Sequence, residues 1–501
     1  MKKNLLAVLL IISTFMVAEL KAQSSQKTRL CGTFLNRPTD TLYLSFYREK
    51  LGLSEAGSDH FTTISKNGKF CFALPEIDHP AYITLTSGNS PRLYLLDYLV
   101  EAGDSVHITI DPSQAEAGQS IARSGLSFSG KGAEKFRANY IVEQLAAKKN
   151  FELPMYTIRL QANLDTLLLG SKDHIQPLGD YKLHVLDSLK EGISTGVYEI
   201  LRCNIFYNTE VVKIRSIINQ WYGGFKFPDS LARRKFMTDY ALKEWENPMV
   251  FGSYLGRRYS KEYLDFLIFR SLLITKCKLA IENTGPITRI IPEIEKTKGV
   301  IGERAFTGMV AYITGLLKNV VDSQSFIDYA NSRVTEPMLK TILNSCITVN
   351  QKGVPIFPFE LTGMKGEKIK ASELKGSAVL LDFWFSGCMP CIEVAKALKK
   401  VKAQVGRMNN IQFLSISADT NRDLWLASVR SEKYSELDDI NSYTGGLGLQ
   451  HPLWQYYQVN ACPRLMLIDA KGNLVSANLF RPVTPEKAQE LIKLLLEAAK
   501  Q

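Results

Sequence analysis

The last third of the chain alternates between apolar runs and segments with one apolar face. Residues 378–384 form an almost uninterrupted apolar run, which is typical of a central parallel strand. Residues 390–405 place apolar side chains at helical spacing, so a helix is expected there. Further strands are expected at 357–361, 411–417, 465–469 and 474–477, with helices after 421 and 484. The pattern predicts an α/β domain over residues 351–501.

The region from 23 to 130 has a different pattern, with short apolar runs separated by turn residues. The runs lie at 42–46, 70–74, 82–85 and 106–110. Strands at this spacing predict a β-rich domain, an antiparallel sandwich or barrel. Cys31 and Cys71 either face each other on neighbouring strands or are buried as free thiols, and both alternatives stay open at this point.

Residues 131–350 change to helical periodicity, with apolar positions three and four residues apart in 136–145, 183–193, 263–279 and 309–320. The many aromatic residues of this region fit the core of a helical bundle or a groove for a partner polypeptide, and the sequence does not separate these roles. A polar stretch with glycine and proline at 350–355 predicts the boundary to the last domain.

The first 22 residues have the pattern of a secretory signal peptide. Lys2 and Lys3 precede an apolar stretch that is short for a membrane span, and small residues follow. Export to the periplasm is therefore expected, with a protein anchored in the inner membrane by an uncleaved signal as the alternative. Any contact with a membrane is expected only through that segment.

The composition of the chain excludes further classes of function. Hydrophobic residues make up 45% of the 501 residues and charged residues 22%, which is ordinary for a globular protein. The formal net charge is +11, but the basic residues form no stripe, so no nucleic-acid partner is expected. Eight scattered cysteines are too few for a disulfide scaffold.

Two of these cysteines carry the candidate chemistry. Cys388-Met389-Pro390-Cys391 lies between the apolar run and the following helix. Backbone N–H groups and the dipole at a helix N-terminus stabilise a thiolate, which is the form of cysteine that attacks disulfides.

The motifs around this pair resemble those of the TlpA/ResA-like, redoxin-type group of exported thioredoxins. Shared features are the run 379–384 before the motif, proline inside the motif, the segment 460–463 before a strand, and the turn 469–472. The resemblance covers residues 353–501. A weaker likeness links the N-terminal β region to the β domain that often precedes such thioredoxins.

The resemblance implies a role for each residue of the motif. Cys388, at the exposed end of the helix, is the expected nucleophile and Cys391 the resolving thiol, so that the two form a redox-active disulfide. Asp382 takes the place of a buried acid with a raised pKa that relays the proton of Cys391. Pro463 is expected to be cis, with the backbone of Cys462 open to an extended substrate.

Substrate contacts are expected from Trp384, Met389, Pro390 and Cys462. Two positions depart from the pattern. Gly387 replaces a frequent tryptophan, and Cys462 replaces a threonine or valine. Cys462 is either a small apolar substitute or a third redox thiol.

The function expected from these features is a periplasmic thiol-disulfide oxidoreductase without a cofactor or metal. Its partners would be exported proteins with disulfides or cysteines and a membrane thiol electron donor, and a reducing direction is favoured over oxidation or isomerisation. One alternative is a binding or scaffold protein with an ancillary thioredoxin domain. Another is a copper(I)-binding protein that uses Met389 and Cys462.

Other chemistries fit the motif less well. A structural zinc site needs four ligands, and one Cys-x-x-Cys pair supplies two. Covalent haem attachment needs histidine where Ile392 stands. A peroxidase of the peroxiredoxin kind needs threonine where Phe385 stands.

Overall fold

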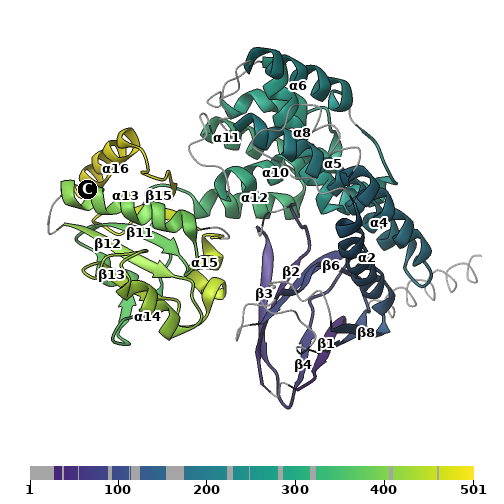
Figure 1. Cartoon of the computed structure of the whole chain (residues 1–501), viewed down its shortest axis with the longest axis horizontal. Helices are drawn as coiled ribbons and strands as arrows, with labels where there is room; N and C mark the ends of the chain where they lie inside the picture. The colour runs from purple at the N-terminus through teal and green to yellow at the C-terminus, as the bar shows by residue number, and fades with distance from the viewer. Residues whose placement is uncertain are drawn as a thin grey trace, which may run out of the picture. The chain divides into compact units, whose positions relative to one another are not determined.

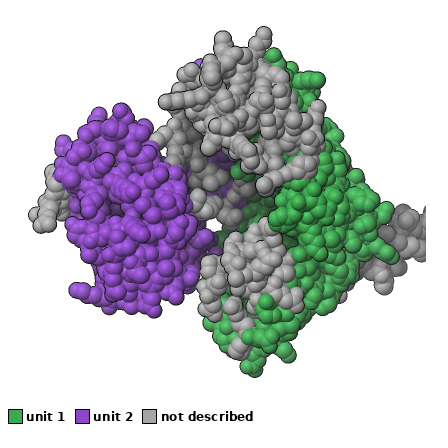
Figure 2. Space-filling model, in the orientation of Figure 1, with its two compact units in different colours: residues 1–52, 57–87, 91–279 green, residues 53–56, 88–90, 280–501 purple. Residues whose placement is uncertain are grey.

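The computed structural model divides into two compact units, each described here by itself (Figure 2). The first comprises residues 1–52, 57–87 and 91–279, and the second comprises 53–56, 88–90 and 280–501. The residues that the structure describes are 27–36, 39–52, 54, 56–87, 93–111, 113, 125–153, 174–222, 230–247, 249–279, 286–315, 323–405, 410–459 and 462–500. The expected signal peptide at 1–22 lies outside them.

A β-sandwich begins the first unit (Figure 1). One described sheet has the order β4-β1-β7-β8 and the other β3-β2-β5-β6. The strands are β1 (Arg29–Phe34), β2 (Thr41–Tyr47), β3 (Ser58–Ile64), β4 (Lys69–Ala73), β5 (Ala81–Ser87), β6 (Leu93–Val100), β7 (Ser105–Ile110) and β8 (Leu126–Lys131). Alternate side chains of both sheets form one apolar core, which confirms the sandwich prediction. The pairing differs in one respect, because β1 and β7 run parallel.

Helices complete the first unit. They are α2 (Ala133–Glu152), α4 (Gln176–Ser188), α5 (Thr195–Tyr222), α6 (Ser230–Trp245), α7 (Tyr254–Tyr259) and α8 (Lys261–Leu279). Phe136 of α2 is buried in the sandwich core. The ammonium of Lys135, also on α2, lies 2.8 Å from the carboxylate of Asp104 and 3.1 Å from that of Glu101. These contacts join α2 to the sandwich.

The second unit begins with the remaining helices of the middle region. These are η3 (Ile287–Ile290), α9 (Ile291–Ile294), α10 (Gly299–Gly315), α11 (Ser323–Arg333) and α12 (Pro337–Val349). The helical region is thus divided between the two units and is not one compact body. Among the described residues, none of the helices combines the length and apolar character that a membrane span requires.

The rest of the second unit is an α/β domain with a sheet of order β10-β9-β13-β12-β11-β14-β15. Its strands are β9 (Glu360–Gly363), β10 (Lys368–Lys370), β11 (Ala378–Trp384), β12 (Ile411–Ser417), β13 (Ile440–Tyr443), β14 (Arg464–Ile468) and β15 (Leu474–Leu479). The central strand β11 pairs parallel to β12 and antiparallel to β14. All seven of its residues are buried, as the apolar run predicts.

Helices cover both faces of this sheet (Figure 1). They are η4 (Ala371–Leu374), α13 (Met389–Val405), α14 (Arg422–Arg430), η5 (Gly448–Gln450), α15 (Pro452–Tyr456) and α16 (Pro485–Ala498). Leucines of α13 and α16 pack on the face that carries Leu380, whereas Leu453 and Trp454 of α15 pack on the face that carries Leu381. The sheet therefore lies between two apolar layers, and β11 delivers its C-terminal end to the start of α13.

Candidate active site

The two cysteines of the motif form a disulfide where β11 gives way to α13. Their Cα atoms are 5.3 Å apart, and Cys388 directly precedes the first residue of the helix. The backbone N–H of Cys391 donates a hydrogen bond to the Cys388 sulfur at 3.2 Å. After reduction, this N–H and the helix dipole would stabilise negative charge on Cys388.

The exposure of Cys388 differs from the expectation of an open nucleophile. In the disulfide, Cys388 is 4% exposed and Cys391 2%. The neighbouring side chains are open instead, with Met389 70% and Phe385 42% exposed, and Pro390 is also exposed. A partner therefore meets an apolar surface around a largely covered disulfide, and Met389 and Pro390 lie where a substrate can touch them.

Hydrogen bonds from distant segments hold the turn before Cys388. Gly387 has φ +93°, a left-handed conformation that glycine adopts without a Cβ clash, and its N–H donates to the Tyr434 hydroxyl at 2.8 Å. The N–H of Ser386 donates to Asp419 at 3.0 Å, and its hydroxyl donates to the same carboxylate at 2.6 Å. These bonds fix the backbone that presents the disulfide.

Trp384 does not meet the expectation of a substrate contact. Its side chain is fully buried, its ring stacks on Tyr434 at 4.7 Å, and its indole N–H donates to the Ser415 hydroxyl at 2.7 Å. The physical reason is that the last residue of the central strand points into the layer between the sheet and α14. Trp384 supports Tyr434, which in turn bonds the turn before Cys388.

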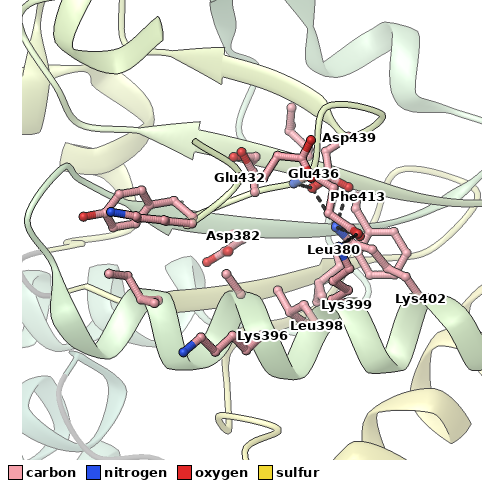
Figure 3. A pocket seen from close by; sticks show the side chains of 17 residues that line it. Leu380, Asp382, Lys396, Leu398, Lys399, Lys402, Phe413, Glu432, Glu436 and Asp439 are labelled. Carbon is pink, nitrogen blue, oxygen red and sulfur yellow. Dashed lines mark hydrogen bonds and ion pairs between the residues drawn. The ribbon is translucent and has the colours of Figure 1, made fainter. Parts of the chain in front are cut away.

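Asp382 is buried in the middle of β11 and faces a cavity of about 160 Å³ beside α13 (Figure 3). Burial raises the pKa of its carboxyl to about 7, against the opposing cation of Lys402 and with a smaller upward contribution from Asp439. Among the described residues, one of its oxygens has no hydrogen-bond partner. The expected raised pKa is confirmed, and the carboxyl titrates near neutrality. The cavity has room for several water molecules, and Ile392, next to Cys391, lines it.

A charged cluster forms the far end of this cavity. The ammonium of Lys402 lies 2.5 Å from Asp439 and 3.3 Å from Glu436, and Lys399 lies 3.1 Å from Glu436 (Figure 3). The carboxylates of Glu436, Asp438 and Asp439 lie close enough together to hold a cation. Since lysines already pair with two of them, the cluster is better suited to neutralise Lys402 than to bind a metal.

The family comparison agrees with this geometry. A family model described as thioredoxin-like matches residues 376–474, the stretch that includes Asp382, both cysteines and Pro463. Within it, a buried central strand leads to a Cys-x-x-Cys disulfide at a helix start. The C-terminal domain is thioredoxin-like.

Several solved structures resemble this chain over less than a third of its length. A proposed thiol-disulfide oxidoreductase from Bacteroides vulgatus has 26% identity, covers 29% of this chain and 96% of its own, and has a TM-score of 0.25. A thiol-disulfide oxidoreductase from Bacteroides fragilis has 24% identity, covers 27% and 98%, and has a TM-score of 0.25. A thiol:disulfide interchange protein from a Bacteroides species has 20% identity, covers 30% and 92%, and has a TM-score of 0.25. No curated protein matches the chain.

The segment before β14 lies beside the disulfide of the thioredoxin-like domain. The peptide bond between Cys462 and Pro463 is cis, as expected. Cys462 is half-buried, remains a thiol, and packs against the cluster that contains Trp384 and both motif cysteines. Burial lowers the pKa of the nearby Arg464 guanidinium to about 10, which still leaves a cation beside Cys462 at neutral pH.

Sequence reasoning missed the residues that hold the site from a distance. Tyr434 lies in the loop after α14, Asp419 in the loop after β12, and Lys402 in the fourth turn of α13. Asp419 lies just before the helix expected after 421, but its carboxylate accepts hydrogen bonds from Ser386 and from the Ser417 hydroxyl. No local pattern marked Tyr434.

Proposed function

We propose that the protein is a thiol-disulfide oxidoreductase of the TlpA/ResA-like group that reduces or exchanges disulfides of exported proteins. The observation that supports it most is the Cys388–Cys391 disulfide at the start of α13, with a hydrogen bond to the Cys388 sulfur and an acid that titrates near pH 7 in the strand below. The export pattern of the first 22 residues supports work in the periplasm.

The chemistry follows from the two sulfurs. The Cys388 thiolate attacks one sulfur of the substrate disulfide, a mixed disulfide forms, and the other substrate sulfur leaves as a thiolate. The Cys391 thiolate then attacks Cys388, which releases the second substrate sulfur and leaves the disulfide seen in the structure. Two electrons pass to the substrate.

Asp382 supplies the proton transfer of the second step. Its carboxylate accepts the Cys391 proton, and the cavity it faces gives that proton a route to solvent. To turn over, the enzyme needs a dithiol donor, for which a membrane thiol carrier is the class that fits the compartment.

Disulfide turnover by the full chain tests the proposal. The wild type should reduce a small disulfide such as oxidised glutathione with dithiothreitol as donor, and Cys388→Ser should not. Cys203→Ser is the matched control, because Cys203 is buried in the first unit and is not in a disulfide. Equal turnover by wild type and Cys388→Ser would refute the proposal and favour a binding or scaffold role.

Trapping then identifies the partners. Cys391→Ala cannot resolve mixed disulfides, so exported proteins should remain attached to Cys388 and can be identified by mass spectrometry. Attached proteins that carry native disulfides would support the reducing direction.

A further inference from the structure

A cavity of about 470 Å³ lies within the first unit, between β6 and the helices α2, α4, α5 and α8. α2 packs beside β6 in this unit (Figure 1). The volume of the cavity lies in the range that ligand-binding pockets occupy, and its lining combines aromatic and aliphatic side chains with amides and charged groups. The cavity is therefore a candidate binding site that the redox chemistry does not use.

One wall of the cavity is the edge of a sheet. In the described sheet, β6 is the last strand and pairs with β5. Tyr98 of β6 belongs to the core between the two sheets, whereas the carboxylate of Asp97 lies 3.2 Å from the ammonium of Lys261 on α8. Since successive side chains of a strand point to opposite faces and both of these line the cavity, it opens along the edge of the strand. An edge strand carries backbone N–H and C=O groups that a further strand can bond.

A bulge in β6 fixes the shape of this edge. Two residues, Leu96 and Asp97, stand opposite the single residue Thr84 of β5. Asp97 has φ +53°, and its N–H donates a hydrogen bond to the Thr84 hydroxyl at 3.3 Å. The bulge turns the Asp97 carboxylate toward Lys261 and toward the buried ammonium of Lys50, which is 3.5 Å away. Bulges of this kind re-aim a side chain and are frequent next to functional sites.

The charged groups that line the cavity are paired with one another. The ammonium of Lys182 lies 2.8 Å from Glu143, and Lys261 forms ion pairs with Glu262 as well as with Asp97. A phosphate or another strongly charged ligand would have to displace these partners, and separating a buried ion pair is costly. The cavity is therefore better suited to a ligand that is polar but uncharged.

The opposite wall offers hydrogen-bonding amides and apolar contacts. Asn139 and Gln144 of α2 line the cavity with half-buried side chains, and within the described part of the chain neither amide makes a hydrogen bond. Each amide has a donor and an acceptor, which is the pairing that a peptide group requires. Val142 of α2, Leu186 of α4 and Leu201 of α5 line the same cavity. These groups fit a peptide main chain with an aliphatic side chain.

We propose that this cavity binds an extended segment of a partner polypeptide, which adds to the edge of β6. The main chain of the segment bonds the β6 backbone on one side and the amides of Asn139 and Gln144 on the other. An aliphatic side chain of the segment enters the part lined by Val142, Leu186 and Leu201. Main-chain hydrogen bonds then give affinity and the side-chain pocket gives selectivity, as in other complexes that form by strand addition. The proposal goes beyond the proposed function and does not depend on the dithiol.

Hydrogen exchange tests the strand addition. The probe is α-lactalbumin that has been reduced and alkylated with iodoacetamide, so that it is unfolded and has no free thiol. The full chain carries Cys388→Ser/Cys391→Ser, which removes any disulfide with the probe. Backbone amides of residues 93–100 should exchange more slowly as the probe concentration rises, because an added strand bonds them.

Two results of this experiment would overturn the proposal. One is unchanged exchange at 93–100 at every probe concentration, including the case in which the probe binds elsewhere. The other is protection of 93–100 without the probe that increases with the concentration of the protein, since the occupant would then be a second copy of this chain.

Filling the cavity tests whether the probe occupies it. Ala147 of α2 is half-buried and lines the cavity, so Ala147→Leu places a larger side chain in its space. The affinity for fluorescently labelled probe, measured by anisotropy, should fall about tenfold or more. Lys148→Leu is the matched control, because Lys148 is the next residue of α2, is exposed and is not part of the lining. Equal affinities of the two variants would show that the probe binds outside the cavity.

A truncation on α2 tests the amides with little risk to folding, because alanine is the most favourable helix residue. Gln144→Ala should weaken probe binding about fivefold through the loss of one hydrogen bond. Lys148→Ala is the control and should bind as the unsubstituted helix does. Urea midpoints of all these variants should match, so that lower affinity does not reflect unfolding. Equal affinities of Gln144→Ala and Lys148→Ala would refute the role of the amide.

This proposal and the proposed function fail independently. If the wild type does not reduce oxidised glutathione but the probe protects 93–100, only the oxidoreductase proposal fails. If the wild type reduces oxidised glutathione and the probe does not protect 93–100, only the binding site fails.

Discussion

Replacement of Asp382 by asparagine should change the pH dependence of stability in a way that follows from burial alone. The carboxyl has a pKa of about 7 in the folded chain, against a reference of 3.8. The folded state therefore binds the proton more tightly, and the wild type loses stability as the pH rises from about 4 to 7. One pKa unit corresponds to about 1.4 kcal/mol. Relative to the fully protonated carboxyl, the wild type therefore loses roughly 2 kcal/mol of unfolding free energy at pH 5 and roughly 4 kcal/mol at pH 8. Asp382→Asn has no titrating group at this position and so does not lose this free energy. The variant should therefore be more stable than the wild type at pH 8, and the difference in unfolding free energy should be smaller at pH 5.

The assay is urea unfolding of the oxidised full chain at pH 5 and pH 8, with pulsed hydrogen exchange read at β11 peptides so that other parts of the chain do not contribute. Asp438→Asn, the same change at an exposed acid nearby, is the control and should show little pH-dependent difference. In the reduced enzyme, Asp382→Asn should also slow release of a trapped substrate from Cys388, because the acceptor for the Cys391 proton is gone. Parallel pH profiles of Asp382→Asn and wild type between pH 5 and 8 would contradict the burial argument.

Three further substitutions test the supports of the site and of the sandwich. Tyr434→Phe removes the acceptor of the Gly387 N–H and should lower domain stability by about 1 kcal/mol and slow attack by Cys388, whereas Tyr443→Phe, the control, should leave the rate of attack unchanged. Gly387→Ala should lower the free energy of unfolding by about 1–2 kcal/mol, because alanine is strained in the left-handed backbone conformation of this residue. Nothing lies within 4 Å of an added Cβ, so no steric clash contributes. An unchanged urea midpoint would argue against that conformation. Lys135→Met leaves the buried Asp104 carboxylate without its cation and should destabilise the first unit by about 3–5 kcal/mol in urea unfolding, and a loss below 1 kcal/mol would show that the pair contributes little.

The sequence predicted the parts of the fold that local periodicity determines. The strand at 378–384 and the strand at 411–417 have the bounds that their apolar runs predict, and the helix after 484 begins where expected, with Thr484 as its N-cap. The sequence analysis listed no run at four strands of the sandwich: β1, β3, β6 and β8. β3 is mostly solvent-exposed, and in β6 the exposed Leu96 and the half-buried Asp97 interrupt the buried positions, so neither shows a clean alternation. β1 and β8 do alternate but contain few apolar residues. The parallel pairing of β1 with β7 joins residues more than 70 positions apart, and no local pattern encodes it.

The same distinction explains what could be predicted about the cysteines. A Cys-x-x-Cys spacing at a helix start places two sulfurs within bonding distance by local geometry alone, so the Cys388–Cys391 disulfide follows from the sequence. Cys31 and Cys71 are 40 residues apart, and their pairing depends on the register of two strands. A shift of one residue in that register would turn one sulfur into the core, which is why both alternatives stayed open before the structure.

The pKa of Asp382 shows how a site depends on residues that carry no motif. A lysine facing a buried acid should lower the pKa of that acid, yet the pKa of Asp382 is raised, with Lys402 lining the same cavity. The reason is that the burial of the carboxyl outweighs the cation. Lys402 is also held by both oxygens of Asp439, at 2.5 and 2.6 Å, and by Glu436, so part of its charge is balanced by these carboxylates. The pKa of Asp382, the proposed proton acceptor, lies near neutrality because the carboxyl is buried and because an ion pair between α13 and the segment before β13 partly balances the cation beside it. Sequence reasoning can find the acid from its place before the cysteines, but its pKa depends on three elements that meet only in the folded domain.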